Sequence, residues 1–296
     1  MQKIDIKGHS GCNIEVIDIN GKLYVKKSSN DPKYIKRLYE QGNKQREDSL
    51  NQQIVDVPKI IDNNINKDKS CAYILMDYIY AKNFIDYFEH ASKADIDEFI
   101  NTFCEYINYE IENSQIDYIS KDIFINKFKS VKGNCYHNPL LIDNPITDKL
   151  LDACEIVFNR LPDYLEMVVG KCHGDLTFSN ILFTSNKFYF IDYLDSFIET
   201  PIQDIVKLRQ DTLYFWSTQM YTKRYDKIRL KIIFNYIDNE IHNYFKSNYQ
   251  YYAHYDILQL MNILRILPYV KEASVRDFLY NIIDEILNKF NDNSHE

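Results

Sequence analysis

The sequence contains no two cysteines close enough together to form a short metal or redox motif. Its six cysteines lie far apart, at positions 12, 71, 104, 135, 154 and 172. That spacing excludes the CxxC pairs of a zinc ribbon or of a thioredoxin-like redox site. We therefore expect free thiols and a protein of a reducing compartment, the cytoplasm.

Long apolar runs are also absent. No run approaches the ~20 residues that a helix needs to cross a bilayer. The N-terminal stretch Met-Gln-Lys-Ile-Asp-Ile-Lys carries charges where the apolar core of a signal peptide would lie. The sequence thus predicts neither membrane insertion nor a secretory leader.

An excess of positive charge is lacking too. Lys and Arg number 35 against 43 Asp and Glu, which gives a net charge of −8. An acidic chain is a poor candidate for binding nucleic acid, whose phosphates require a basic surface. The 296 residues, 45% hydrophobic and 26% charged, are typical of a globular protein with a substantial core.

The N-terminal part of the chain predicts strands and one helix. Alternating residues at 4–6, 13–19 and 22–27 indicate strands, and Asn20-Gly21 between the last two is a strong hairpin signal. Asp31-Pro32 is typical of a helix start, and the helix is expected to run to about Leu50. The apolar run over 72–80 predicts a buried strand.

The rest of the chain predicts mostly helices. A capping box at Ser92–Asp95 precedes an apolar helix face over 96–111. In chain order, the other predicted elements are a helix over about 147–161, strands over 181–183 and 188–191, and helices over about 204–291 that Pro268 interrupts.

One stretch carries the pattern of a catalytic site. Asp175 lies in a predicted loop, Asn180 precedes a strand, and Asp192 ends the return strand. A hairpin of this length brings Asn180 and Asp192 to the same end of its two strands. Their amide and carboxylate oxygens are hard ligands that suit Mg²⁺ with bound phosphates. Asp175 could then orient a hydroxyl and accept its proton. Each residue alone is typical of a turn or cap, but together they predict a phosphotransfer site.

The same stretch also resembles a known family. Residues 173–180 read His-Gly-Asp-Leu-Thr-Phe-Ser-Asn, and residues 191–193 read Ile-Asp-Tyr. They resemble the motifs H-G-D-x-x-x-x-N and I-D-[FYW] of the aminoglycoside phosphotransferase and choline kinase family, which has a protein-kinase-like fold. The resemblance implies that Asp175 is the catalytic base and that Asn180 and Asp192 hold Mg²⁺.

Neighbouring residues refine this resemblance. It implies that His173 fixes the loop backbone and does not react. Gly174 and Thr177 stand where a protein kinase has Arg and Lys. These differences favour a small-molecule kinase over a protein kinase.

The resemblance further implies a lysine that holds the α- and β-phosphates and a helix glutamate that pairs with it. Lys26, in the strand after the hairpin, aligns best with the lysine, although the adjacent Lys27 would face the other side of the strand. Glu40 is the preferred partner, and Glu47 is the alternative.

Nucleotide-binding positions follow from the resemblance in the same way. Gly8 and Gly11 lie in a turn that could cover phosphates, because glycine permits close backbone approach. Asp77 and Ile79 occupy the place of a kinase hinge, whose backbone would hydrogen-bond adenine.

The fold class that the resemblance implies is α+β, bilobal and protein-kinase-like. We expect a β-rich N-lobe over residues 1–79 and a larger, mostly helical C-lobe over residues 80–296, which contains the catalytic loop at 172–195 and the acceptor site. The implied reaction is ATP- and Mg²⁺-dependent phosphate transfer to a hydroxyl of a small molecule: a sugar or cell-surface precursor, an amino alcohol or an aminoglycoside. GTP as donor, the oligomeric state, and a catalytically inactive nucleotide-binding scaffold stay open as alternatives.

Overall fold

The computed structural model describes residues 12–185 and 187–292. They form two compact units. The first unit comprises the described residues up to Tyr106 together with His173–Asp195 and Tyr225–Ile233; the second comprises Ile107–Cys172, Ser196–Arg224 and the described residues from Phe234 onward. Within these residues, no helix is both long enough and apolar enough to cross a membrane. A small sheet near the N-terminus and a mostly helical remainder confirm the predicted α+β class.

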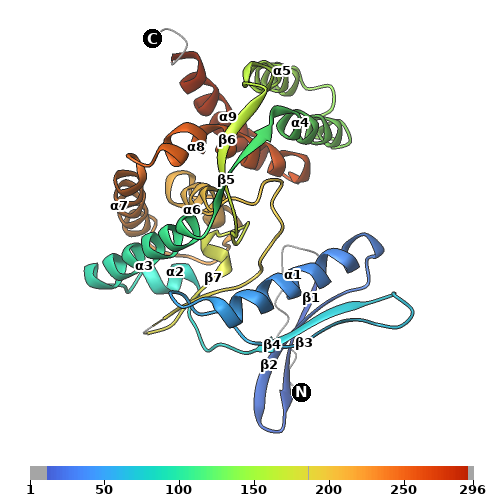
Figure 1. The fold of residues 1–296 in the computed structure, drawn as a ribbon, viewed down its shortest axis with the longest axis vertical. Coiled ribbons are helices and arrows are strands. Elements are labelled where there is room, and N and C mark those ends of the chain that lie inside the picture. Colours follow the sequence, from blue (N-terminus) through green and yellow to red (C-terminus); the bar gives the residue numbers. More distant parts are fainter. Residues whose placement is uncertain (1–11, 186, 293–296) are drawn as a thin grey trace. The chain divides into compact units, whose positions relative to one another are not determined.

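A four-stranded antiparallel sheet with the order β1-β2-β4-β3 dominates the first unit (Figure 1). Its strands are β1 (Asn13–Ile19), β2 (Lys22–Ser29), β3 (Ile60–Ile65) and β4 (Ala72–Asp77). Asn20 and Gly21 join β1 to β2 with φ angles of 56° and 81°. Both angles lie in the left-handed region that a type I′ hairpin turn requires, so the predicted hairpin is confirmed.

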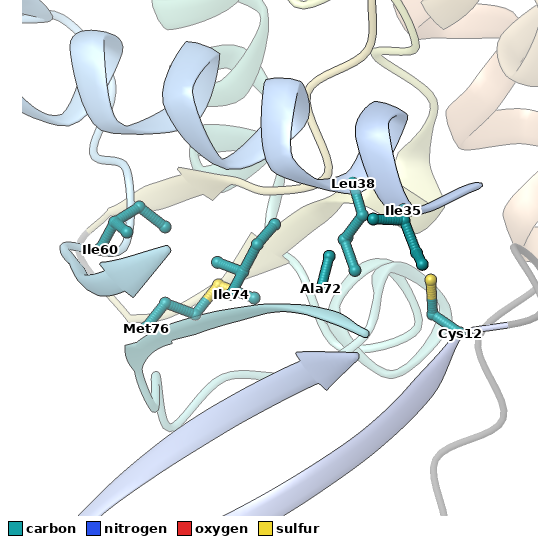
Figure 2. Close-up of a cluster of buried hydrophobic side chains, with 7 residues drawn as sticks. All are labelled: Cys12, Ile35, Leu38, Ile60, Ala72, Ile74 and Met76. Atoms are coloured by element: carbon teal, nitrogen blue, oxygen red, sulfur yellow. The ribbon is translucent and has the colours of Figure 1, made fainter. Parts of the chain in front are cut away.

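Helix α1 (Pro32–Asn51) packs on one face of this sheet. Asp31 caps the helix by accepting a hydrogen bond from the Lys33 amide at 2.9 Å. Figure 2 shows the buried side chains between helix and sheet: Cys12, Ile35, Leu38, Ile60, Ala72, Ile74 and Met76. Because side chains alternate along a strand, the residues of β2 that lie opposite Ile74 and Met76 face α1 as well.

The first unit also contains a short hairpin, which comes later in the sequence than this sheet. Its strands are β7 (Ile181–Phe183) and β8 (Phe188–Phe190), preceded by the 3₁₀ helix η1 (Phe178–Asn180). Helix α2 (Phe84–Phe88) and the first part of α3 (Lys93–Glu112) pack on the hairpin through a cluster of phenylalanine rings. These ring contacts pack the hairpin against the two helices.

The second unit is mainly helical. Its elements are β5 (Gln115–Ser120), α4 (Lys121–Cys135), α5 (Pro145–Arg160), β6 (Tyr164–Val169), α6 (Ile202–Tyr214), the 3₁₀ helix η2 (Trp216–Met220), most of α7 (Lys227–Phe245), α8 (Tyr249–Ile266), the 3₁₀ turn η3 (Leu267–Tyr269) and α9 (Ala273–Asp292). In α6, polar residues are buried along with apolar ones. Arg209 of α6 and Asp238 of α7 form a buried two-bond ion pair, with distances of 2.9 Å and 2.8 Å.

Most predicted elements are present, and the differences are local. The helices at α1, α3 and α5 and the strands β7 and β8 lie where the sequence predicts them. The strands β3 and β5 and the helix α4 were not predicted from the sequence. The prediction for β4 extended to Tyr80, whereas the strand ends at Asp77. The lobe boundary at 79/80 stays a prediction; the division into compact units places His173–Asp195, most of the predicted catalytic loop, in the first unit.

Candidate active site

A buried histidine holds the loop that precedes Asp175. The Nε2–H group of His173 donates to the Ile191 carbonyl at 2.8 Å, and its Nδ1 atom accepts from the Asp175 amide at 3.3 Å. One donating and one accepting nitrogen define a neutral imidazole. Burial lowers the pKa of His173 to about 4. The ring therefore stays neutral near pH 7, and its position matches the backbone-fixing role expected from the sequence.

Gly174 lies against the segment that follows Asp192. Its φ angle is +85°, and a Cβ atom there would lie 2.1 Å from the carbonyl oxygen of Leu194. The Leu194 amide in turn donates to the His173 carbonyl at 2.9 Å. Only glycine satisfies both the left-handed backbone and this close approach.

Asn180 fixes the orientation of Asp175. Its Nδ2 group donates to the Asp175 carbonyl at 2.7 Å and to the Asp175 carboxylate oxygen Oδ2 at 3.2 Å. The end of η1 places Asn180 immediately before β7. The amide nitrogen is thus committed to Asp175, which leaves the amide oxygen of Asn180 for another partner.

Asp192 lies next to Asn180 across the hairpin. Ile181 pairs with Phe190, and the Ile191 amide donates to the Asn180 carbonyl at 3.0 Å. Asp192 follows directly, with a left-handed φ of 64° that aspartate tolerates better than most residues. The hairpin therefore brings Asn180 and Asp192 to the same end, as its length predicts.

Lys27 of β2 pairs with Asp192. Its Nζ atom lies 2.9 Å from Asp192 Oδ1, and the lysine side chain is only 3% exposed. Burial lowers the pKa of Lys27, but the Asp192 carboxylate, together with Tyr34 and Cys12, raises it, and the net shift is upward. The ion pair joins the N-terminal sheet to the hairpin within the first unit.

Lys26 lies on the other face of β2. Its ammonium group lies 5.1 Å from the centre of the Tyr73 ring. The strand register gives the reason: Lys27 is opposite Ile74, on the face toward α1, whereas Lys26 is opposite Leu75. The motif alignment preferred Lys26, but the structure places Lys27 beside Asp192. Lys27 therefore replaces Lys26 as the candidate phosphate-holding residue.

The expected glutamate partner lies away from this pair. Glu40 is on the exposed side of α1, 3.3 Å from Lys36, and Glu47 is exposed as well. Another residue of α1, Lys44, contacts the segment after Asp192, because its Nζ atom donates to the Leu194 carbonyl at 2.7 Å. Sequence reasoning missed Lys44, because a lysine on a helix rich in charged residues carries no distinguishing signal.

The predicted hinge segment, which includes Asp77 and Ile79, lies at the end of β4. The Asp77 amide donates to the Lys59 carbonyl at 3.0 Å, and the Asp77 side chain pairs with Lys22 at 2.7 Å. Among the described residues, the backbone of Ile79 makes no hydrogen bond. Ile79 thus stays a candidate for adenine binding, and Asp77 can contribute only through its carbonyl. Gly8 and Gly11 lie outside the described residues.

A cavity of about 530 Å³ opens beside the hinge. Tyr78, Tyr80 and Lys82 line it on the hinge side, and Phe183 lines it from the hairpin. Its wall includes neither Asp175 nor Asp192, so we do not assign it to the reacting groups.

The metal-binding potential of the site rests on two oxygen donors. In the described part of the chain, no cluster of three or more His, Cys, Asp or Glu side chains could hold a metal ion. Mg²⁺ does not need one, since it commonly takes one or two protein ligands and completes its shell with water and substrate phosphates. The Asp192 carboxylate already faces a cation, the Lys27 ammonium, at 2.9 Å. With the amide oxygen of Asn180, these residues fit Mg²⁺ held jointly with a nucleotide.

The family of the chain follows from a comparison with protein-family models. The model of the phosphotransferase enzyme family matches residues 46–230, more than half of the chain, including the Asp175 loop and Asp192. The chain belongs to this phosphotransferase family. The predicted family resemblance and the predicted enzyme class are thereby confirmed. A comparison with curated proteins found no match.

Solved structures similar to this phosphotransferase share its fold. The choline kinase LicA from Streptococcus pneumoniae has a TM-score of 0.60 at 12% identity, covering 98% of this chain and 94% of that one. Aminoglycoside 2'-phosphotransferase-IIIa, solved with GDP, has a TM-score of 0.60 at 14% identity, covering 99% and 93%. A thermostable mutant of aminoglycoside phosphotransferase APH(4)-Ia, solved in a ternary complex with ADP and hygromycin B, has a TM-score of 0.57 at 11% identity, covering 97% and 93%. At such identities the likeness concerns the fold alone, and the predicted protein-kinase-like fold is confirmed.

Proposed function

We propose that this phosphotransferase moves the γ-phosphate of ATP to a hydroxyl group of a small molecule. The observation that carries the proposal is the orientation of Asp175 by Asn180, at 2.7 Å and 3.2 Å, on a hairpin that also bears Asp192. A carboxylate held in this way beside two oxygen donors for a cation suits proton acceptance from an alcohol during phosphoryl transfer.

Each polar residue of the site has a role in this reaction. Asp175 orients the acceptor hydroxyl and takes its proton as the new oxygen–phosphorus bond forms and the bond to the ADP oxygen breaks. Lys27 moves its charge from Asp192 to the α- and β-phosphates. Asn180 and Asp192 would hold Mg²⁺, which supplies charge neutralisation on the phosphates. Catalysis then rests mainly on positioning and electrostatics.

The donor and acceptor classes rest on similarity as well as on the site. The similar structures include complexes with ADP and with GDP, which support a nucleotide donor and keep GTP as an alternative to ATP. The same set includes aminoglycoside phosphotransferases, a choline kinase and a glucosamine kinase. A sugar or cell-surface precursor, an amino alcohol or an aminoglycoside is therefore the proposed acceptor.

A two-step experiment tests this proposal. Thermal stability is first measured with Mg²⁺-ATP and Mg²⁺-GTP, each alone and with sugars, amino alcohols or aminoglycosides added. A ligand at a hundredfold excess over its Kd stabilises the folded state by about 2.7 kcal/mol, which such a measurement detects. Acceptors that add a further shift are then incubated with nucleotide, and the products are analysed by mass spectrometry.

We expect a metal-dependent nucleotide shift and one acceptor class that gains a single phosphoryl group. A nucleotide shift with no phosphorylated product from any acceptor class would instead favour the inactive scaffold. No shift with either nucleotide, from a folded sample, would contradict the nucleotide site itself.

A further inference from the structure

Helix α1 is connected to the active-site loop through a lysine. Lys44 Nζ donates to the Leu194 carbonyl at 2.7 Å, and the two residues are separated by 150 positions in the sequence. Both belong to the first unit. The side chain of Lys44 is half-buried, so this charge-assisted hydrogen bond is shielded from bulk water more than a surface contact would be.

Leu194 contacts the loop that carries Asp175 and is close in sequence to Asp192. Its amide donates to the His173 carbonyl at 2.9 Å, and its carbonyl oxygen lies 2.1 Å from the position that a Cβ atom of Gly174 would take. Asp192 is two residues earlier, in a left-handed conformation. The peptide groups of Leu194 therefore fix the segment that carries Asp192 against the loop that carries Asp175.

No glutamate of α1 serves this connection in the described residues. Lys27 pairs with Asp192 at 2.9 Å, while Glu40 pairs with Lys36 on the exposed side of the helix at 3.3 Å. Lys44 therefore connects α1 to the loop by a hydrogen bond, whereas the ion pair of Lys27 is with Asp192 and not with a glutamate of the helix.

We propose that Lys44 is a positioning residue that holds the metal-binding segment in place from α1, so that Asp192 and Asn180 bind Mg²⁺ with the nucleotide. This inference rests on the proposed function. Lys44 acts through the Leu194 carbonyl.

The test measures nucleotide binding in two conditions. The Kd of AMP-PNP is determined by calorimetry with Mg²⁺ and with EDTA for the full chain and for Lys44→Met, Lys44→Arg and Lys36→Met. Lys36→Met is the matched control, since it removes a lysine from the exposed side of the same helix. Circular dichroism and thermal unfolding verify that each variant is folded.

We expect Lys44→Met to lose roughly tenfold of the Mg²⁺-dependent gain in affinity, the effect of one charge-assisted hydrogen bond, while its Kd in EDTA is unchanged. Lys44→Arg, which keeps charge and donor, restores most of the gain, and Lys36→Met behaves like the wild type. A merely structural role would weaken binding equally in both conditions and would overturn the proposal.

Two other results separate this inference from the proposed function. If the wild type binds Mg²⁺-AMP-PNP and Lys44→Met binds it equally well, the role of Lys44 is refuted and the proposed function stands. If the wild type does not bind AMP-PNP in either condition, the proposed function fails and the role of Lys44 fails with it. Should Lys44→Met not fold, Lys44→Gln replaces it, and the expected loss is in the same direction but smaller, because the amide is a neutral donor.

Discussion

The buried ammonium group of Lys27 lies 2.9 Å from the carboxylate of Asp192. The two residues are far apart in the sequence. Lys27 belongs to the N-terminal sheet, and Asp192 follows the hairpin that comes after the Asp175 loop. Without a nucleotide, each neutralises the other. We infer that Mg²⁺-nucleotide binding separates the pair, because phosphates then neutralise Lys27 and Mg²⁺ neutralises Asp192.

Replacing Lys27 should therefore have a larger effect than replacing its neighbour. Lys27→Met should reduce phosphate transfer by roughly 10- to 100-fold, since hydrogen bonds to charged groups contribute about 1.5–3 kcal/mol. Lys26→Met should stay near the wild-type rate, because Lys26 contacts Tyr73 on the opposite face. Steady-state kinetics with Mg²⁺-ATP and the acceptor that the ligand screen identifies would measure both. The reverse order of effects would return the phosphate-holding role to Lys26.

The site could be predicted from the sequence only where it depends on local spacing. Asp175, Asn180 and Asp192 belong to a loop and a short hairpin, so their intervals predict which of them come together. The choice between Lys26 and Lys27 depends on the register of β2 against β4. One residue of slip exchanges the two faces, and a sequence does not fix that register.

The missed strand β3 shows a second limit. Its sequence, Ile-Ile-Asp-Asn-Asn-Ile, contains residues typical of turns. In the structure, the amide of Asn63 is buried and donates to the Tyr39 carbonyl and to Asn43, both on α1, at 2.9 Å each. These tertiary contacts satisfy the NH₂ group of the buried side chain and permit a strand there. The contact of Lys44 with Leu194 also could not be predicted from the sequence, because it joins residues 150 positions apart.

Gly174 and Gly21 provide a matched test of the close approach at the catalytic loop. Both have positive φ angles, 85° and 81°, but a Cβ atom at Gly21 would meet nothing within 4 Å. Gly21→Ala should lower the free energy of unfolding by about 1 kcal/mol, from backbone strain alone. Gly174→Ala should lower it further, because the Cβ atom would strike the Leu194 carbonyl. Urea unfolding measures both, and equal losses would show that the loop can move away from Leu194.

The stability of the fold should fall in mild acid because of His173. Its pKa is about 4 in the folded state, against 6.5 for an unperturbed histidine. The unfolded chain therefore binds an extra proton between these values, so the free energy of unfolding should rise with pH across this window. The contribution is up to about 3 kcal/mol at neutral pH relative to pH 4. NMR titration of the imidazole checks the cause: a midpoint near 6.5 in the folded protein would refute it.

The buried ion pair of the second unit predicts a non-additive pair of substitutions. Arg209 makes two hydrogen bonds to Asp238 and a further one to Tyr251. Arg209→Met should cost about 3–5 kcal/mol, because it leaves the Asp238 carboxylate buried without its partner. The double variant Arg209→Met with Asp238→Leu should recover much of that loss. Chemical unfolding of four proteins, the wild type, Arg209→Met, Asp238→Leu and the double variant, measures the coupling, and strictly additive losses would contradict a coupled pair.

The central claim is that Asp175 accepts the proton of the acceptor hydroxyl, and Asp175→Asn tests it most directly. The measurement compares AMP-PNP affinity and the rate of phosphate transfer in the wild type, in Asp175→Asn and in Asp195→Asn, a control at an exposed aspartate of the same segment. We predict that Asp175→Asn binds AMP-PNP as the wild type does but transfers phosphate about 10²–10⁴ times more slowly, the usual contribution of general-base catalysis. Transfer at the wild-type rate by Asp175→Asn would contradict the account.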